Sequence, residues 1–181
     1  MQRIRFNRKI VFCVVSVLLI VGLILLDQLL KNYFKTKYAS GDSKFVIDNF
    51  FYFTYTFNTG AAFSFLATKS WAQLFFKILT GVSLIGFIIL MIFSFKKNYK
   101  FLTVALVFVI SGAMGNFIDR LMYDGVVDFI GFIFFGWHFP VFNIADICMC
   151  VGVVMVLIHF LFLDNNALFK KNGKEEVSDN E

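Results

Sequence analysis

Four long apolar segments constrain the fold of this chain more than any other feature. They cover about residues 10–30, 72–94, 101–121 and 141–163. Each is long enough to cross a hydrocarbon core as a helix, which needs about 20 residues. Hydrophobic residues make up 59% of the chain, above the roughly 45–50% apolar share of soluble domains, and the excess needs lipid to face. The sequence therefore predicts a polytopic α-helical membrane protein with four transmembrane helices.

The basic residues predict how the chain is oriented. Three clusters of them lie before the first apolar segment, between the second and third, and after the last: Arg3, Arg5, Arg8, Lys9, Lys96, Lys97, Lys100, Lys170, Lys171 and Lys174. Cytoplasmic loops carry an excess of Lys and Arg, so we expect both termini in the cytoplasm and the loops 32–71 and 122–140 outside. The net charge of +5 does not indicate nucleic acid as a partner, because no groove-reading or base-stacking motif accompanies it.

The two outer loops differ in pattern from ordinary connectors. Residues 45–57 are aromatic and partly alternating, which favours a small β-structure. Residues 122–140 are apolar and broken by glycines, which suits a segment lying at the outer interface. We expect a single membrane-embedded domain over residues 1–164 and a polar cytoplasmic tail over residues 165–181.

Polar residues at membrane depth are the candidate functional residues, because burying them in a bilayer is costly. They cluster near the outer ends of three segments and in the second outer loop: Asp27, Lys31, Asn116, Asp119, Arg120, Asp128, Asn143 and Asp146. Side chains three or four residues apart share a helix face, as Asp27 and Lys31 do, although an ion pair fixing the helix end explains that pair equally well. Pro140 suits the start of the fourth helix.

Carboxylates are the main chemistry that these residues offer. His138 and His159 lie apart from the cluster, and the spacing of Cys13, Cys148 and Cys150 does not suit a metal site. Two close carboxylates in a low-dielectric site share a proton, which allows them to activate water for peptide hydrolysis. The same residues suit an ion- or proton-coupled transporter equally well, and a non-catalytic membrane assembly factor is a third alternative.

Five sequence blocks then indicate a family. They occur in order along the chain: DQLLK from Asp27, NTGAAF from Asn58, GAMGNFIDR from Gly112, VVDF from Val126 and FNIAD from Phe142. Together they resemble the lipoprotein signal peptidase family, also called type II or prolipoprotein signal peptidases, over roughly residues 10–163. The chain departs from the family in having Ser111-Gly112 where Gly-Gly is common, which concerns helix packing more than chemistry.

The resemblance implies an aspartic endopeptidase and assigns roles to individual residues. It implies four membrane helices with an outer β-cradle matching residues 45–66 and an outer helix or flap within 122–140. Asp128 and Asp146 match the catalytic pair. Asp119 is the rival carboxylate, with orientation of Arg120 and helix packing as its expected role. The remaining positions match substrate-binding or supporting residues: Asn58, Gly60, Asn116, Arg120, Asn143, Asp27 and Lys31.

The resemblance also implies a substrate and a place in the cell. The substrate is a prolipoprotein whose lipobox Cys carries diacylglycerol, and cleavage falls on the N-terminal side of that Cys. No cofactor, metal or nucleic acid is implied, and we expect a monomer in contact with membrane lipid. The expected location is the bacterial inner membrane, with the active site near its outer face.

Overall fold

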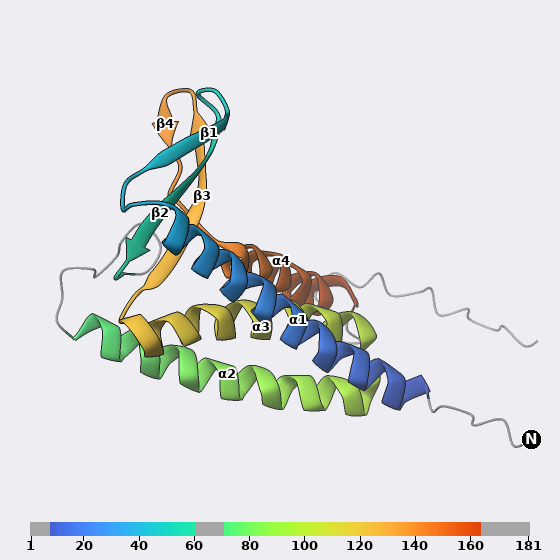
Figure 1. Cartoon of the computed structure of the whole chain (residues 1–181). Coiled ribbons are helices and arrows are strands. Elements are labelled where there is room, and N and C mark those ends of the chain that lie inside the picture. The colour runs from blue at the N-terminus through green and yellow to red at the C-terminus, as the bar shows by residue number, and fades with distance from the viewer. Residues whose placement is uncertain (1–7, 61–70, 164–181) are drawn as a thin grey trace, which may run out of the picture.

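The computed structural model describes residues 8–60 and 71–163, and four long helices form most of it (Figure 1). They are α1 (Arg8–Lys37), α2 (Ala72–Lys97), α3 (Lys100–Tyr123) and α4 (Ile144–Ile158), and the π-helix η2 (His159–Leu163) continues α4. All four, the last taken together with η2, are long and apolar enough to cross a membrane, which confirms the prediction of four spans. The largest difference in length is at α1, which continues seven residues beyond its predicted end.

Helix α3 is the centre of the bundle. It packs against α1, α2 and α4, and its Leu102, Leu106 and Ile110 belong to a buried apolar cluster with Leu84 and Met91 of α2. The other three helices leave many large apolar side chains exposed along their lengths. Such faces suit contact with lipid, because lipid tails are as apolar as the side chains themselves.

Glycines allow α3 and α4 to approach each other closely. A Cβ added at Gly115 would lie 3.0 Å from the Ala145 Cβ, and one added at Gly112 would overlap the Ala145 backbone oxygen. The neighbouring Ser111 donates to the Val107 oxygen of its own helix at 2.6 Å. The small residues needed at this interface are therefore present, and Ser111 satisfies its hydroxyl within α3.

The two outer loops join in one antiparallel sheet with the order β1-β2-β3-β4. Its strands are β1 (Ser43–Ile47), β2 (Phe51–Asn58), β3 (Val126–Phe134) and β4 (Trp137–His138). Figure 1 shows this sheet projecting from one end of the helix bundle, opposite the end that carries the N-terminus. In the β2–β3 pairing, Thr56 lies opposite Asp128 and Asn58 lies opposite Val126.

Several expectations can now be compared with the structure. The predicted β-structure in residues 45–57 is confirmed. Residues 122–140 contain β3 and β4 where the resemblance implied an outer helix or flap, because a run of β-branched and aromatic residues from Val126 pairs with β2. Helix α4 starts at Ile144, so the predicted start at Pro140 is wrong. Residues 61–66 of the expected cradle and the expected tail over 165–181 lie outside the described residues.

Candidate active site

Asp146 is positioned by the first turn of α4. The Asn143 side chain accepts a hydrogen bond from the Asp146 backbone N–H at 2.9 Å, and the Asp146 Oδ2 accepts one from the Asn143 N–H at 3.1 Å. This reciprocal pair is a capping box, which satisfies two backbone donors at the start of the helix. The cap therefore fixes the Asp146 carboxylate at the sheet-facing end of α4.

Asp128 reaches the same place from the sheet. It lies on β3 and is 4% exposed. Its Oδ1 accepts from the Asn143 Nδ2 at 2.7 Å and its Oδ2 from the Asn58 Nδ2 at 3.2 Å. Burial, followed by the nearby negative charge of Asp146, raises the pKa of Asp128 to about 7, against the effect of the Asn58 and Asn143 hydrogen bonds. The Asp128 carboxyl is therefore partly protonated near neutral pH.

Asn116 connects the Asp146 carboxylate to α3 and α1. Its Nδ2 donates to the Asp146 Oδ1 at 2.7 Å. Its Oδ1 accepts from the Lys31 Nζ at 2.9 Å and from the Asn143 Nδ2 at 3.1 Å. Because both ends of this amide are used, the position of Asp146 depends on three helices at once.

A buried ion cluster lies behind Asn116. The Lys31 Nζ is 2.8 Å from the Asp27 Oδ2 and 3.1 Å from the Asp119 Oδ2. The Asp27 Oδ1 also accepts from the Ala145 N–H of α4 at 2.9 Å. The predicted Asp27–Lys31 proximity is confirmed, and the pair extends into a network that binds α1 to α3 and α4.

Asp119 belongs to this cluster and not to the carboxylate pair. Its Oδ2 accepts from the Val127 N–H at 3.1 Å, next to Asp128, and its hydrogen bonds and ion pair within the described chain do not include Arg120. Its role in orienting Arg120 and the helix packing therefore stays a prediction, and its place in the cluster suits a supporting role. Gln28, which was not among the predicted site residues, also belongs to the cluster: its Nε2 donates to the Asp119 Oδ1 at 2.9 Å and to the Gly115 oxygen at 3.1 Å.

Arg120 and Gly60 lie at the edge of the same site. The Arg120 Nη2 is 3.4 Å from the Gly60 oxygen and its Nη1 is 3.3 Å from the Asn116 oxygen. The Gly60 N–H donates to the Asn58 Oδ1 at 2.9 Å. Within the described part of the chain, the buried Arg120 Nε has no hydrogen-bond partner. The guanidinium therefore has a donor that no described residue uses.

Both carboxylates line one cavity of about 670 Å³. Its polar wall combines Asp128 and Asp146 with three other side chains: Asn58, Asn116 and Arg120. The rest of its lining is mainly apolar and comes from the approach to α4 and from α4 itself, including Phe139, Val141, Phe142, Ile147, Met149 and Val151. A mostly apolar cavity with a few polar groups suits a ligand that is largely apolar but carries a polar reacting bond.

Other catalytic chemistries find little support among the described residues. No group of three or more His, Cys, Asp or Glu side chains in that part of the chain could hold a metal ion. The three cysteines form no disulfide. His159 lies beside the Tyr99 ring, with the centroids 5.2 Å apart, and Tyr99 precedes the first residue of α3. The convergent chemistry is the carboxylate pair, which can take a proton from water and donate one to a carbonyl or amine.

Comparisons with known proteins find similar sequences and a similar fold. A family model described as signal peptidase (SPase) II matches residues 19–162. A lipoprotein signal peptidase of Bacillus pumilus is 43% identical over 139 residues, covering 77% of this chain and 87% of that protein. One of Coxiella burnetii is also 43% identical over 139 residues, covering 76% and 84%. A solved bacterial membrane enzyme, determined in meso, has a TM-score of 0.72 at 35% identity and covers 89% of this chain and 94% of its own.

Proposed function

The chain belongs to the signal peptidase II family, and we propose that it removes the signal peptide from diacylglyceryl-modified prolipoproteins as an aspartic endopeptidase. The cut falls on the N-terminal side of the lipobox Cys. Asp128 and Asp146 are the catalytic pair. The observation that carries the proposal is that these two carboxylates, one on β3 and one on α4, open into the same cavity and are linked through Asn143.

The pair hydrolyses a peptide bond with one water molecule. The pKa of Asp128, about 7, makes it the acid, so Asp146 is the base. Asp146 takes a proton from the water as its oxygen attacks the scissile carbonyl carbon, while Asp128 hydrogen-bonds the carbonyl oxygen. As the C–N bond breaks, the leaving nitrogen receives a proton from the pair. General acid–base help of this kind is worth roughly 10²–10⁴-fold in rate.

The surrounding residues position the substrate and the pair. Arg120 and Asn58, which line the cavity with Asp128, offer donors to the substrate backbone. The Asp27–Lys31–Asp119 cluster holds α1, α3 and β3 together behind the site. A site assembled from several rigid elements keeps its groups in the reactive geometry, which lowers the barrier without further chemistry.

The apolar wall of the cavity accounts for a lipidated substrate. Asp146 lies one turn into α4, so the carboxylates are near one membrane surface. Met149 and Val151 continue the cavity wall along α4, where acyl chains can remain against apolar side chains. Since three clusters of basic residues flank the opposite ends of the spans, the site faces outward from the bacterial inner membrane and both termini are cytoplasmic. The protein acts as a monomer.

The test is cleavage of a lipidated precursor by the purified protein in detergent, without any ion gradient. We expect Asp128→Asn and Asp146→Asn each to lower turnover by roughly 10²–10⁴-fold. The double variant should be no worse than either single one, because groups that act as a unit are non-additive. Asp48→Asn, at an exposed turn position, is the matched control. Substantial turnover by either single variant would overturn the pairing, and an uncut precursor with the parent protein would refute the peptidase.

A further inference from the structure

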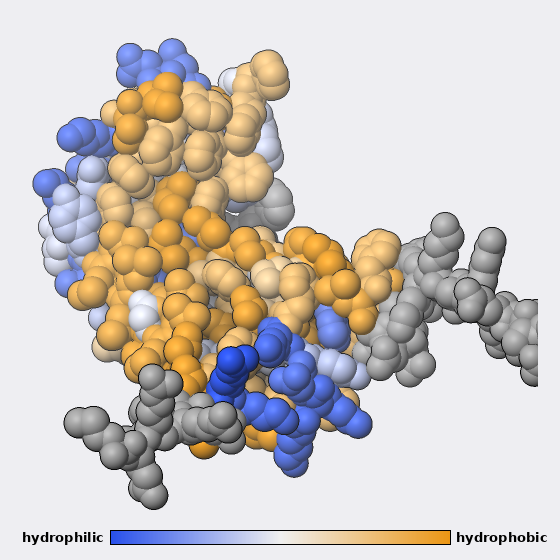
Figure 2. All heavy atoms as spheres, turned by 90° about the vertical axis from the view of Figure 1, so that its right-hand side faces the viewer, coloured by the Kyte–Doolittle hydropathy of each residue, from blue (hydrophilic) through white to orange (hydrophobic). Residues whose placement is uncertain are grey.

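A second cavity lies at the opposite end of the bundle from the carboxylates. Its volume is about 640 Å³, and it is enclosed by the start of α1, the end of α2 and the start of α3. Figure 2 looks onto this end and shows hydrophilic residues gathered in one group beside an apolar surface. The peptidase mechanism uses none of the residues that line this cavity.

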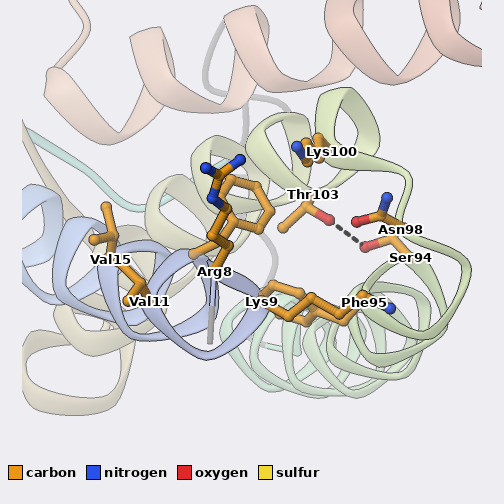
Figure 3. A pocket seen from close by; sticks show the side chains of 10 residues that line it. Arg8, Lys9, Val11, Val15, Ser94, Phe95, Asn98, Lys100 and Thr103 are labelled. Carbon is orange, nitrogen blue, oxygen red and sulfur yellow. Dashed lines mark hydrogen bonds between the residues drawn. The ribbon is translucent and has the colours of Figure 1, made fainter. Parts of the chain in front are cut away.

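The lining of this cavity divides into a basic rim and an apolar wall. Its cationic residues are Arg8 and Lys9 from α1 and Lys100 from α3, and none of the lining residues within 8–60 and 71–163 is acidic. Figure 3 shows Arg8 on α1 and Lys100 on α3 among the side chains that line the cavity. The apolar wall consists of side chains from α1 and α2: Val11, Phe12, Val15 and Phe95.

The hydroxyl groups inside the cavity are already satisfied. The Ser94 Oγ and Thr103 Oγ1 are hydrogen-bonded to each other at 2.8 Å (Figure 3). The Ser94 Oγ is also within hydrogen-bond distance of the Met91 oxygen, and the Thr103 Oγ1 of the Tyr99 oxygen. The start of α3 has no side-chain cap, and the partial positive charge of a helix N-terminus adds to that of the cations. The cationic residues of the rim are therefore the groups that would bind a charged ligand, and such a ligand must be an anion.

We propose that this cavity binds an anionic phospholipid. The phosphate lies between Arg8 and Lys100, and one acyl chain lies against Val11, Val15 and Phe95. Charge complementarity selects the head group, because basic pockets between membrane helices at the cytoplasmic side suit anionic lipids. The apolar wall selects a lipid over free phosphate, since phosphate alone would leave these side chains uncovered.

The test compares retention of dioleoyl phosphatidylglycerol and dioleoyl phosphatidylcholine by the full-length purified protein in native mass spectrometry. We expect the parent to retain phosphatidylglycerol preferentially. Arg8→Gln with Lys100→Gln should weaken that retention about thirtyfold, which is about 2 kcal/mol for two cations. Lys96→Gln with Lys97→Gln removes two charges at the same end from residues that do not line the cavity, and should change retention less than about threefold.

A second pair of variants tests the apolar wall without altering charge. Val15→Trp fills the cavity and should weaken phosphatidylglycerol retention, whereas Val14→Trp, which is exposed but outside the lining, should not. Equal effects of the two double charge variants would overturn the proposal in favour of general surface attraction. Displacement of the lipid by millimolar inorganic phosphate or glycerol 3-phosphate would overturn it in favour of a phosphate site. Cleavage of precursor in detergent should be unchanged in all four variants, so this proposal can fail independently of the peptidase.

Discussion

Replacing Asp128 by Asn should stabilise the protein at alkaline pH while it removes activity. Asp128 is 4% exposed, and its pKa is raised from 3.8 to about 7, first by burial and then by Asp146. Between these two pH values the folded protein holds a proton at Asp128 that the unfolded chain has lost. Stability contributed at this site is therefore present below about pH 4 and is lost as pH rises through about 7.

The magnitude follows from the shift and from the hydrogen bonds. A difference of about three pKa units corresponds to about 4 kcal/mol of lost stability above pH 7. Asn carries no charge and escapes this loss, but its amide would face the Asn58 Nδ2, which now donates to Asp128 at 3.2 Å. Asn58 cannot turn its amide without losing the bond from the Gly60 N–H, so a donor–donor contact costs about 1–2 kcal/mol. The net gain at pH 8 is about 2 kcal/mol.

Thermal unfolding in detergent at a fixed scan rate measures this gain. Asp128→Asn should melt about 4–8 °C above the parent at pH 8, at about 2–4 °C per kcal/mol for a chain of this size. The two melting temperatures should converge near pH 5. Asp48→Asn, at an exposed position, should show no such pH dependence. Two results would refute a buried Asp128 carboxyl with a raised pKa. One is a variant that melts below the parent at pH 8, and the other is a difference in melting temperature that stays constant from pH 5 to 8.

Three further predictions concern the supporting residues and the orientation. Arg120→Lys keeps the charge but loses the planar fork that reaches Gly60 and Asn116, so the cleavage rate should fall roughly tenfold to hundredfold with an unchanged melting temperature. Turnover at the parental rate would show that charge alone suffices. Asp119→Asn should cost about 2 kcal/mol of stability by breaking the bonds to Lys31 and the Val127 N–H, yet folded molecules should still cleave the precursor. An inactive, well-folded variant would make Asp119 a catalytic candidate. In a Cys-free background, a Cys at Ser43 should react with an impermeant thiol reagent in spheroplasts and a Cys at Asn98 should not; the reverse labelling would invert the proposed orientation.

The helices could be predicted from the sequence because their signal is local. An apolar run of about 20 residues predicts a membrane helix wherever it lies. The Asp27–Lys31 pair was equally accessible, since residues four apart on a helix meet. The third member of that cluster, Asp119, is distant in the chain, and only the packing of α1 on α3 brings it to Lys31.

The sheet shows where local patterns stop being informative. Residues 126–134 form an apolar run that periodicity alone cannot assign to helix or strand. Its conformation is decided by pairing with β2, about seventy residues earlier, where Thr56 meets Asp128. The same pairing places Asn58 beside the Asp128 carboxyl. The β-structure and one side of the site therefore arise from the same long-range contact.

The start of α4 had a local signal that was overlooked. Asn143 followed three residues later by Asp146 resembles a capping pair at the start of an apolar helix, and it marks the helix start better than Pro140 does. In the structure, the Asn143 N–H donates to the Asp146 Oδ2, and the Asn143 Nδ2 donates to the Asp128 Oδ1 at 2.7 Å. Asn143, which caps the start of α4, is therefore also the residue that connects the two carboxylates. Each carboxylate oxygen retains a second lone pair after these bonds, so the cap can fix Asp146 and still leave it able to accept a proton from water.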